Sequence, residues 1–390
     1  MSREFYIPNK ILTGNGALEG AAPYIKQMGK KPLLVSGPNT SKAPCFDELK
    51  KLLDKLEMSY GIFCDITGEP TDTIVNSCVK AYKDNECDSF IAIGGGSALD
   101  TMKAAAALAV MGGKIADYMG KQIDGKLPSM AAIPTTAGTG SEATKFTVIT
   151  DVATGVKMLL SGPSLIPDIA IVDYDYCVSA PKSITAATGL DALTHAIESY
   201  TSKKAQPLTD TVALSAVKRI FKYLPAAYND GNDVKAREEM SIAALEAGIA
   251  INNASVTIVH GMSRPIGANF HVPHGISNAM LLEKCLGFAL DGAYDRFAEL
   301  ARAIGAADKS DSDESAAETL IMAINELCKE CEIPTLAEYG IDKKKFYSVM
   351  DKMAEDAIAS GSPSNTIKTV MKDDVIAIYR SLWEQYNTYG

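Results

Sequence analysis

The chain has 390 residues, of which 47% are hydrophobic and 22% charged, and its formal net charge is −10. This composition supports more than one buried core, and the negative charge argues against nucleic acid or an anionic membrane as a partner. The longest apolar stretch, Ala104 to Met111, is too short to span a bilayer. The scattered cysteines and the lack of an apolar N-terminal segment lead us to expect a cytoplasmic protein.

Up to about residue 175, short apolar runs alternate with amphipathic stretches, the pattern of a parallel sheet with helical crossovers. We expect helices between the runs, for example at Asp47 to Glu57 and Thr71 to Asp84. The runs that we expect to form strands are Pro32 to Ser36, Gly61 to Ile66, Phe90 to Ile93, Met130 to Ile133 and Ile169 to Val172.

The third of these runs leads through Gly94, Gly95 and Gly96 to Ser97 and into a helical pattern. Glycines let backbone amides approach a ligand closely, and the free N–H groups of a helix N-terminus favour phosphate. The spacing fits neither the G-x-G-x-x-G fingerprint nor a Walker A loop. A tight turn is the alternative interpretation, but the strand–glycine–helix order favours a pyrophosphate site.

The fourth run is followed at once by a polar segment, Pro134 to Glu142, with four hydroxyls and two glycines. Taken alone, this segment is equally well explained as a threonine-rich helix cap. The carboxyl ends of parallel strands meet at one edge of a sheet, so this segment and the glycine loop should lie together. The two segments together predict a nucleotide cradle.

After Asp173 the strand-like runs stop, and long segments with helical periodicity follow at Ala186 to Tyr200, Pro207 to Leu224 and Val234 to Ile251. We therefore expect two domains. Residues 1–178 should form an α/β dinucleotide-binding domain with a Rossmann-like parallel sheet. Residues 179–390 should form an all-α metal-binding and substrate domain.

The chain has only four histidines, and three of them fall in one short stretch. The fourth, His195, follows Asp191 by four residues, so the two share one face of a helix. Considered alone, Asp191 is better explained as a charge at the N-terminus of a helix, and His195 as a hydrogen-bonded histidine of the core. His260 and His274 complete a set of one carboxylate and three imidazoles, with Pro273 forcing a new element to start at His274. This set predicts a site for Fe(II) or Zn(II) with a position open to a substrate oxygen.

Nearly from end to end, the chain resembles the iron-containing, or group III, alcohol dehydrogenases. Gly94 to Lys103 and Pro134 to Glu142 resemble the two cofactor segments of that family, and Gly189 to Glu198 and His260 to Gly275 resemble its two metal signatures. The resemblance implies a metal-dependent, NAD(P)-linked enzyme that interconverts short primary alcohols or diols and their aldehydes. It implies the metal ligands Asp191, His195, His260 and His274, and a nucleotide site that includes Gly94, Gly95, Gly96, Ser97, Asp100, Thr135, Thr136, Thr139 and Lys157.

Arg264 departs from the family pattern, because many members have a histidine there that has been proposed to relay protons. An arginine does not deprotonate, so it cannot take that part. His271 is the remaining histidine, and we predict that it is the catalytic relay or a group supporting the ligands. A plain surface histidine is the alternative.

The end of the first expected strand also departs from the family. Members that prefer NAD have an acidic residue there, whereas this chain has Gly37, followed by Asn39 and the polar run Thr40 to Lys42. No charge repels a 2′-phosphate, and these side chains can donate hydrogen bonds to one. We predict that NADP is accepted and favoured, with equal use of NAD as the fallback. Glu69 replaces an asparagine that several relatives have near the cofactor, with an effect that the sequence does not predict.

Three apolar residues, Phe146, Ile251 and Val256, match positions that line the substrate pocket in relatives, and they suit a short aliphatic chain. Phe146 replaces a polar residue of lactaldehyde-reducing relatives, which makes a diol less favoured, and a plain core role is the alternative for all three.

Other classes of protein remain open: a lyase like dehydroquinate synthase, a glycerol dehydrogenase, a hydroxyacid–oxoacid transhydrogenase, or a non-catalytic scaffold. We expect a small-molecule alcohol or aldehyde partner and a homodimer or higher homo-oligomer. Phe5 to Pro8 and Ile11 to Gly16 can form a hairpin, in a region that often pairs across a dimer in relatives.

Overall fold

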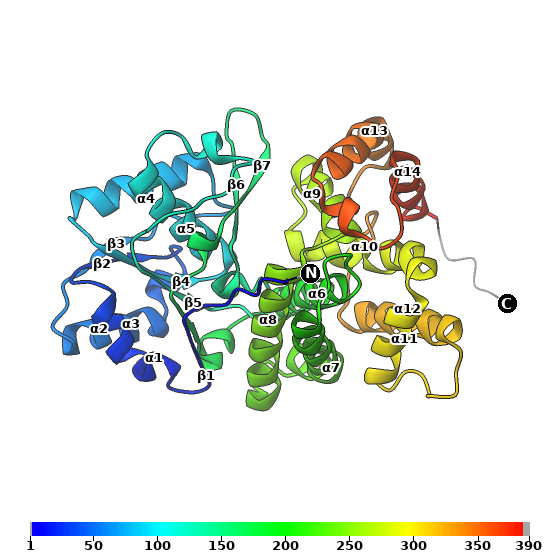
Figure 1. The fold of residues 1–390 in the computed structure, drawn as a ribbon, viewed down its shortest axis with the longest axis horizontal. Coiled ribbons are helices and arrows are strands. Elements are labelled where there is room, and N and C mark those ends of the chain that lie inside the picture. The colour runs from blue at the N-terminus through cyan, green and yellow to red at the C-terminus, as the bar shows by residue number, and fades with distance from the viewer. Residues whose placement is uncertain (1, 385–390) are drawn as a thin grey trace.

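A six-stranded parallel sheet is the centre of the N-terminal part in the computed structural model, which describes residues 2–384 (Figure 1). The order of the strands across the sheet is β1-β8-β5-β4-β2-β3, and every neighbouring pair is parallel. The strands are β1 (Lys10–Thr13), β2 (Pro32–Val35), β3 (Gly61–Phe63), β4 (Ser89–Gly94), β5 (Met130–Pro134) and β8 (Ile169–Val172).

Helices cover both faces of this sheet, which is why its central strands read as unbroken apolar runs. Successive residues of β2 alternate between two cores: Leu33 and Val35 pack with α4 (Asp72–Asp84) and α5 (Gly96–Met111). Leu34 points the other way, into a core that holds the apolar side chains of three helices. These helices are α1 (Ala17–Gly20), α2 (Ala22–Met28) and α3 (Pro44–Lys55).

Two features near the sheet differ from the sequence-based expectations. An antiparallel hairpin of β6 (Phe146–Thr150) and β7 (Lys157–Ser161) was not predicted, because its strands are only half-buried and give a weak apolar signal. The expected N-terminal hairpin is wrong. β1 instead adds to the edge of the sheet beside β8, and Tyr6 exchanges hydrogen bonds with Asn252 and Asn253 of the helical part.

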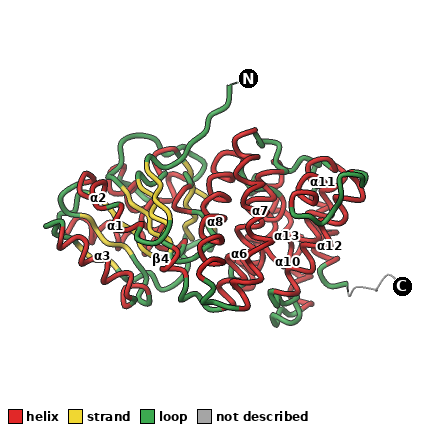
Figure 2. Tube along the Cα trace, turned by 90° about the horizontal axis from the view of Figure 1, so that it is seen from below, coloured by secondary structure: helices red, strands yellow, loops and turns green. Residues whose placement is uncertain are grey.

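The C-terminal part is helical, and strands are confined to the other end of the molecule (Figure 2). α6 crosses its centre, is apolar around most of its circumference and is buried from Thr185 onward apart from Thr188. The predicted fold class is confirmed, while the division into domains at residue 178 stays a prediction. The helices are α6 (Lys182–Tyr200), α7 (Pro207–Asn229), α8 (Val234–Ala254), α9 (Ile258–Phe270), α10 (His274–Ala289), α11 (Tyr294–Ala303), α12 (Asp313–Glu330), α13 (Lys343–Ala359) and α14 (Lys372–Ser381).

The two parts touch backbone to backbone at a pair of glycines. Gly140 follows β5 in a left-handed conformation (φ 62°), and Gly248 lies in α8. A Cβ atom on Gly140 would lie 2.4 Å from Cα of Gly248, and one on Gly248 would lie 2.6 Å from the carbonyl oxygen of Gly140. Any side chain at either position would therefore push the helical part away from the sheet.

Within residues 2–384, no single helix is long and apolar enough to cross a membrane. Only α8 and α9 taken together reach that length and composition, and they are bent against each other by 104°. All eight cysteines are free thiols, six of them buried, and burial raises the pKa of each.

We predict that Gly248→Ala lowers the free energy of unfolding by roughly 1–3 kcal/mol, because the added methyl group overpacks the contact with Gly140. The matched control is Gly287→Ala, at an exposed position of α10 with open space around it, which should stabilise by about 0.5–1 kcal/mol. Urea denaturation of both variants measures the difference. Equal stabilisation by the two alanines would contradict the close approach.

Candidate active site

A cavity of about 680 Å³ lies between the sheet and the helical part. One wall comes from the start of α5 and the hairpin β6–β7, and the other from α6, α8, α9 and the start of α10. In an open parallel sheet, ligands bind where strands end at their carboxyl side, and this cavity adjoins the ends of β4 and β5. All three predicted pocket residues, Phe146, Ile251 and Val256, line it.

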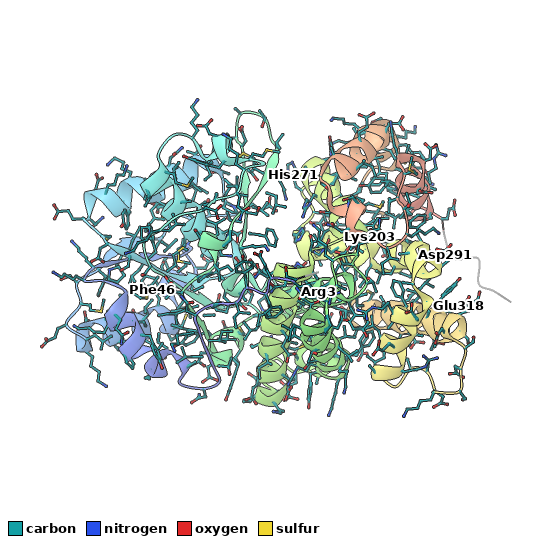
Figure 3. All side chains as sticks on the ribbon, in the orientation of Figure 1. Arg3, Phe46, Lys203, His271, Asp291 and Glu318 are labelled. Carbon is teal, nitrogen blue, oxygen red and sulfur yellow. The ribbon has the colours of Figure 1, made fainter. Side chains whose placement is uncertain are left out.

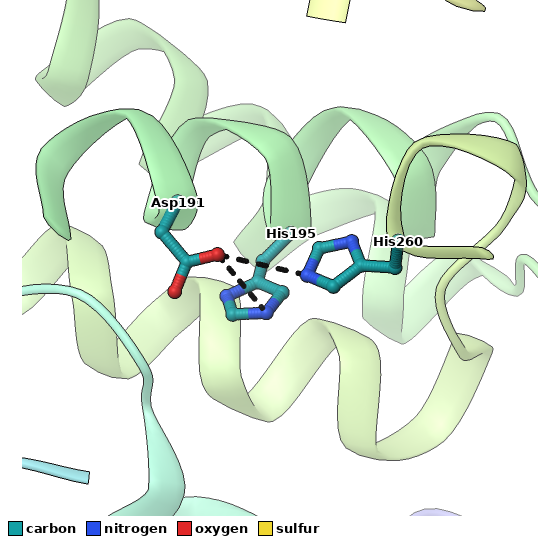
Figure 4. Close-up of side chains that lie close together, drawn as sticks. All are labelled: Asp191, His195 and His260. Atoms are coloured by element: carbon teal, nitrogen blue, oxygen red, sulfur yellow. Dashed lines mark ion pairs between the residues drawn. The ribbon is translucent and has the colours of Figure 1, made fainter. Parts of the chain in front are cut away.

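The three histidines among the four predicted metal ligands converge on one carboxylate oxygen of the fourth, Asp191. Asp191 and His195 lie one turn apart on α6, and His260 comes from α9 (Figure 4). His274 is the first residue of α10. The Nε2 atoms of His260, His274 and His195 lie 3.6, 3.7 and 3.9 Å from Oδ1 of Asp191. One ligand atom each from Asp191, His195 and His260 falls within 4.8 Å of the others.

The protonation of this cluster suits a metal. Burial raises the pKa of Asp191, but the neighbouring histidines outweigh burial and hold that pKa well below its usual value. Burial lowers the pKa of His195 to about 4, so its ring is neutral near pH 7. The side chain of His274 is 39% exposed, toward the cavity. Burial likewise lowers the pKa of His274 to about 3, whereas the carboxylates of Glu198 and Asp191 outweigh burial and raise the pKa of His260. A buried carboxylate facing imidazole nitrogens is a donor set that Fe(II) or Zn(II) accepts.

Asn278 marks the place where a cation fits. It lies one turn after His274 on α10, and its Nδ2 donates to Oδ1 of Asp191 at 2.7 Å. The same nitrogen is 3.2 Å from Nε2 of both His260 and His274. A single amide group thus faces one carboxylate oxygen and two imidazole nitrogens. The acceptors outnumber the donors, which fits a positive ion at this point.

Glu198 holds one of these histidines in place. It is fully buried on α6, and its Oε1 accepts hydrogen bonds from Oγ1 of Thr257 (2.6 Å) and the backbone N of Val259 (2.7 Å). Its Oε2 lies 2.5 Å from Nδ1 of His260. Burial raises the pKa of Glu198, but His260 and the hydrogen bonds outweigh it and keep the carboxylate ionised. Nδ1 of His260 therefore carries the proton, and Nε2 is left to face Asp191.

The two predicted cofactor segments lie side by side. The backbone N of Thr135 donates to the carbonyl oxygen of Gly94, and a Cβ atom on Gly96 would lie 2.8 Å from Cγ2 of Thr139. This close approach is a physical reason for glycine at the start of α5. Gly95 and Thr136 belong to the same turns, and Gly37 and Asn39 follow β2, the strand beside β4. The predicted cofactor residues that line the cavity are Gly96, Ser97, Asp100, Thr139 and Lys157.

Asp100, which lines the cavity, and the fully buried Lys103 form a polar frame on this wall. The oxygens of Asp100 accept from Oγ of Ser141 (2.7 Å) and the backbone N of Val148 (2.8 Å). Nζ of Lys103 donates to Ser141 and to atoms of Thr144 and Phe146 at 2.8–3.0 Å. Burial lowers the pKa of Lys103 to about 8. These contacts fasten α5 to the hairpin β6–β7, which is a structural role that the sequence did not predict.

Two further predicted residues lie at the edge of the cavity. Nζ of Lys157 forms an ion pair with Oε1 of Glu69 at 2.8 Å, so a phosphate has to compete with that carboxylate. His271 ends α9 in a left-handed conformation (φ 54°), and its side chain is exposed at the rim (Figure 3). In residues 2–384, no hydrogen bond joins its ring to a metal-site residue, and its catalytic role stays a prediction.

Comparison with known proteins agrees with this architecture. The family described as "Iron-containing alcohol dehydrogenase" matches residues 8–174, and "Fe-containing alcohol dehydrogenase family, C-terminal" matches residues 185–383. An NAD-dependent methanol dehydrogenase of Bacillus methanolicus is 37% identical over 362 residues, which are 92% of this chain and 95% of that protein. Alcohol dehydrogenase 4 of Schizosaccharomyces pombe is 37% identical over 383 residues, 97% of this chain and 88% of that protein.

The fold itself agrees as well. The solved structure of a 1,3-propanediol oxidoreductase superposes with a TM-score of 0.95 at 32% identity, covering 98% of this chain and 100% of that one. The fold and the cavity define a two-part oxidoreductase with a nucleotide-type sheet and a helical metal-site part. The chain belongs to the iron-containing alcohol dehydrogenase family, as its sequence motifs predicted. Its class of reaction is the interconversion of an alcohol and a carbonyl compound, and the lyase and scaffold alternatives are not favoured.

We predict that Glu198→Gln weakens Fe(II) or Zn(II) binding by roughly 10–100-fold, because an amide no longer fixes the proton of His260 on Nδ1. The control is Thr257→Val, which removes one donor to Glu198 and leaves its contact with His260 intact. Competition with a chromophoric chelator gives the affinities, and circular dichroism checks the fold. Unchanged affinity in a folded Glu198→Gln protein would remove Glu198 from the metal site.

Proposed function

We propose that the protein reversibly reduces short aliphatic aldehydes to primary alcohols with NADPH or NADH and a divalent metal, Fe(II) in preference to Zn(II). The observation that carries the proposal is the cluster of Asp191, His195, His260 and His274 on one wall of a cavity whose other wall is the glycine–threonine cradle. We further propose a cytoplasmic homodimer, with no nucleic-acid or membrane partner, in keeping with the charge of −10.

In the mechanism, the residues of the chain position the reactants. When bound, the metal supplies Lewis-acid activation of the substrate oxygen, and the nicotinamide carries the hydride. Asp191 and the three histidines would hold the ion, and Glu198 orients His260. The backbone around Gly96 and Ser97, at the start of α5, would bind the pyrophosphate. His271, at the exposed rim, exchanges the proton with solvent.

The apolar wall of the cavity supports a short aliphatic substrate. Phe146, Ile251 and Val256 line the cavity, and an apolar lining around a bound substrate would strengthen the electrostatic interactions within the site. The names of relatives point the same way, since one is a methanol dehydrogenase and another a 1,3-propanediol oxidoreductase. Aldehydes of two to five carbons are therefore the first substrates to try.

NADP is the cofactor that we propose as favoured. Gly37 carries no charge after β2, and Asn39 and Lys42 are polar groups in the turn that follows. No acidic residue stands between Val35 and Lys42 to repel a 2′-phosphate. The methanol dehydrogenase among the relatives is named as NAD-dependent, so both cofactors belong in the test.

We predict anaerobic consumption of NADPH by Fe(II)-loaded protein with aldehydes of two to five carbons, and its loss in Asp191→Ala. The variant removes the one carboxylate on which the three imidazoles converge. Absorbance at the nicotinamide band follows the reaction, and metal analysis shows whether the ion is lost with the activity. Turnover that persists in metal-free Asp191→Ala would refute metal dependence.

We predict a higher kcat/KM for NADPH than for NADH, with the ratio lowered about tenfold in Asn39→Asp, because the new carboxylate repels a 2′-phosphate. Asn39→Asp is nearly isosteric, so packing changes little. Steady-state kinetics with both cofactors at one aldehyde concentration measure the ratio. A clear preference of the unmodified protein for NADH would disprove the assignment.

A further inference from the structure

Arg264 places a cation on the wall of the active-site cavity. It follows His260 by four residues on α9, which puts both side chains on one face of the helix, about 6 Å apart along its axis. The residues on either side, Ser263 and Pro265, are buried, and Arg264 is only partly exposed. A molecule whose reacting end is at the metal cluster therefore has Arg264 within reach of its other end.

The guanidinium of Arg264 makes few hydrogen bonds within the protein. A guanidinium has five N–H donors, and the hydrogen bond found here runs from Nη1 to Oγ of Ser362 at 2.9 Å. Ser362 is itself buried and lines the same cavity. No carboxylate of residues 2–384 lies within ion-pair distance of Arg264.

Three other buried or half-buried arginines of this chain have acceptors within the fold. Arg219 pairs with Glu239 and Glu246, and Arg296 bonds both Asp210 and a backbone carbonyl. Arg237 has three hydrogen-bond acceptors, two of them backbone carbonyls. Arg264 differs from all three, because the hydrogen bond found for it goes to Ser362 alone, and the rest of its five donors can meet a ligand in the cavity that it lines.

The other charges in the cavity do not compensate Arg264. Three carboxylates line the cavity, and each already has a partner within the protein. Glu69 pairs with Lys157, Asp100 accepts from Ser141 and Val148, and Asp191 faces the histidine cluster. A metal ion at the cluster would add further positive charge. The cavity therefore favours a substrate with a negative charge of its own and disfavours a cationic one.

We propose that Arg264 and Ser362 form a carboxylate subsite, so that the preferred substrate is a short aldehyde or alcohol with a carboxylate at its far end. This proposal rests on the proposed dehydrogenase function and narrows its substrate class. The flat guanidinium matches a carboxylate with two parallel N–H···O bonds, and the Ser362 hydroxyl adds a third donor when it rotates toward the ligand. The apolar walls at Phe146, Ile251 and Val256 then cover the short carbon chain between the two ends.

The test compares two four-carbon aldehydes, 4-oxobutanoate and butanal, which differ in the terminal carboxylate. kcat/KM is measured for both with Fe(II)-loaded unmodified protein, Arg264→Gln, Arg264→Lys and the control Lys222→Gln. Lys222 is an exposed lysine of α7 away from the cavity, so its variant removes one positive charge without touching the site. Binding of the unreactive anion butanoate is measured by calorimetry on the same proteins, and metal analysis verifies equal loading.

We expect the unmodified protein and Lys222→Gln to favour 4-oxobutanoate over butanal. Arg264→Gln should lower that ratio on the order of tenfold or more and weaken butanoate binding in parallel. Arg264→Lys should recover part of the ratio, because it keeps the charge without the paired geometry.

Three results would overturn the subsite: no preference for 4-oxobutanoate in the unmodified protein, equal losses for both aldehydes in Arg264→Gln, or a change confined to the KM for the nicotinamide cofactor. The second would make Arg264 a positioning residue for the metal cluster, and the third would assign it to the cofactor. Failure of every aldehyde in loaded, folded protein would count against the proposed function instead. Butanoate binding that depends on Arg264 would still support the subsite in that case.

Discussion

The negative charge of one buried carboxylate, Asp191, is the constraint on which the helical part depends. An ionised carboxylate without compensation costs several kcal/mol in a protein interior, and this one is compensated by groups from three different helices. α6, α9 and α10 can hold those groups only if their apolar faces pack in one arrangement. The packing of the helical core around α6 therefore determines whether these groups can surround Asp191. Glu198 also fixes the loop before α9, because it accepts hydrogen bonds from Thr257 and Val259.

The sheet side of the cavity is organised by a second buried polar group. Lys103 and Asp100 fix α5, the turn at Ser141 and the hairpin β6–β7 relative to one another. The glycine pair at Gly140 and Gly248 then sets how closely that assembly approaches α8. The distance between the cofactor wall and the metal wall thus follows from backbone contact and from a buried lysine, neither of which touches the reacting atoms.

Much of this could be predicted from the sequence, because it depends on local spacing. The strands of the sheet, the long helices, the glycine loop and the i, i+4 pair of Asp191 and His195 all leave periodic signals. Asn278 and Glu198 could also have been predicted, since each lies one or two helical turns from a predicted ligand. Ser362 was not, because its contact with Arg264 joins residues that are 98 apart in the chain. The hairpin β6–β7 was missed because polar residues interrupt its two short, half-buried strands.

The burial of the cysteines has a consequence for how the protein behaves in the laboratory. A thiol reacts as the thiolate, and raised pKa values keep all eight protonated near neutral pH. Because the cysteines are spread over both parts of the chain, alkylation at these sites reports opening of the structure. The cysteine thiols can therefore serve as probes of local unfolding, and the order in which they become modified shows which part of the molecule opens first.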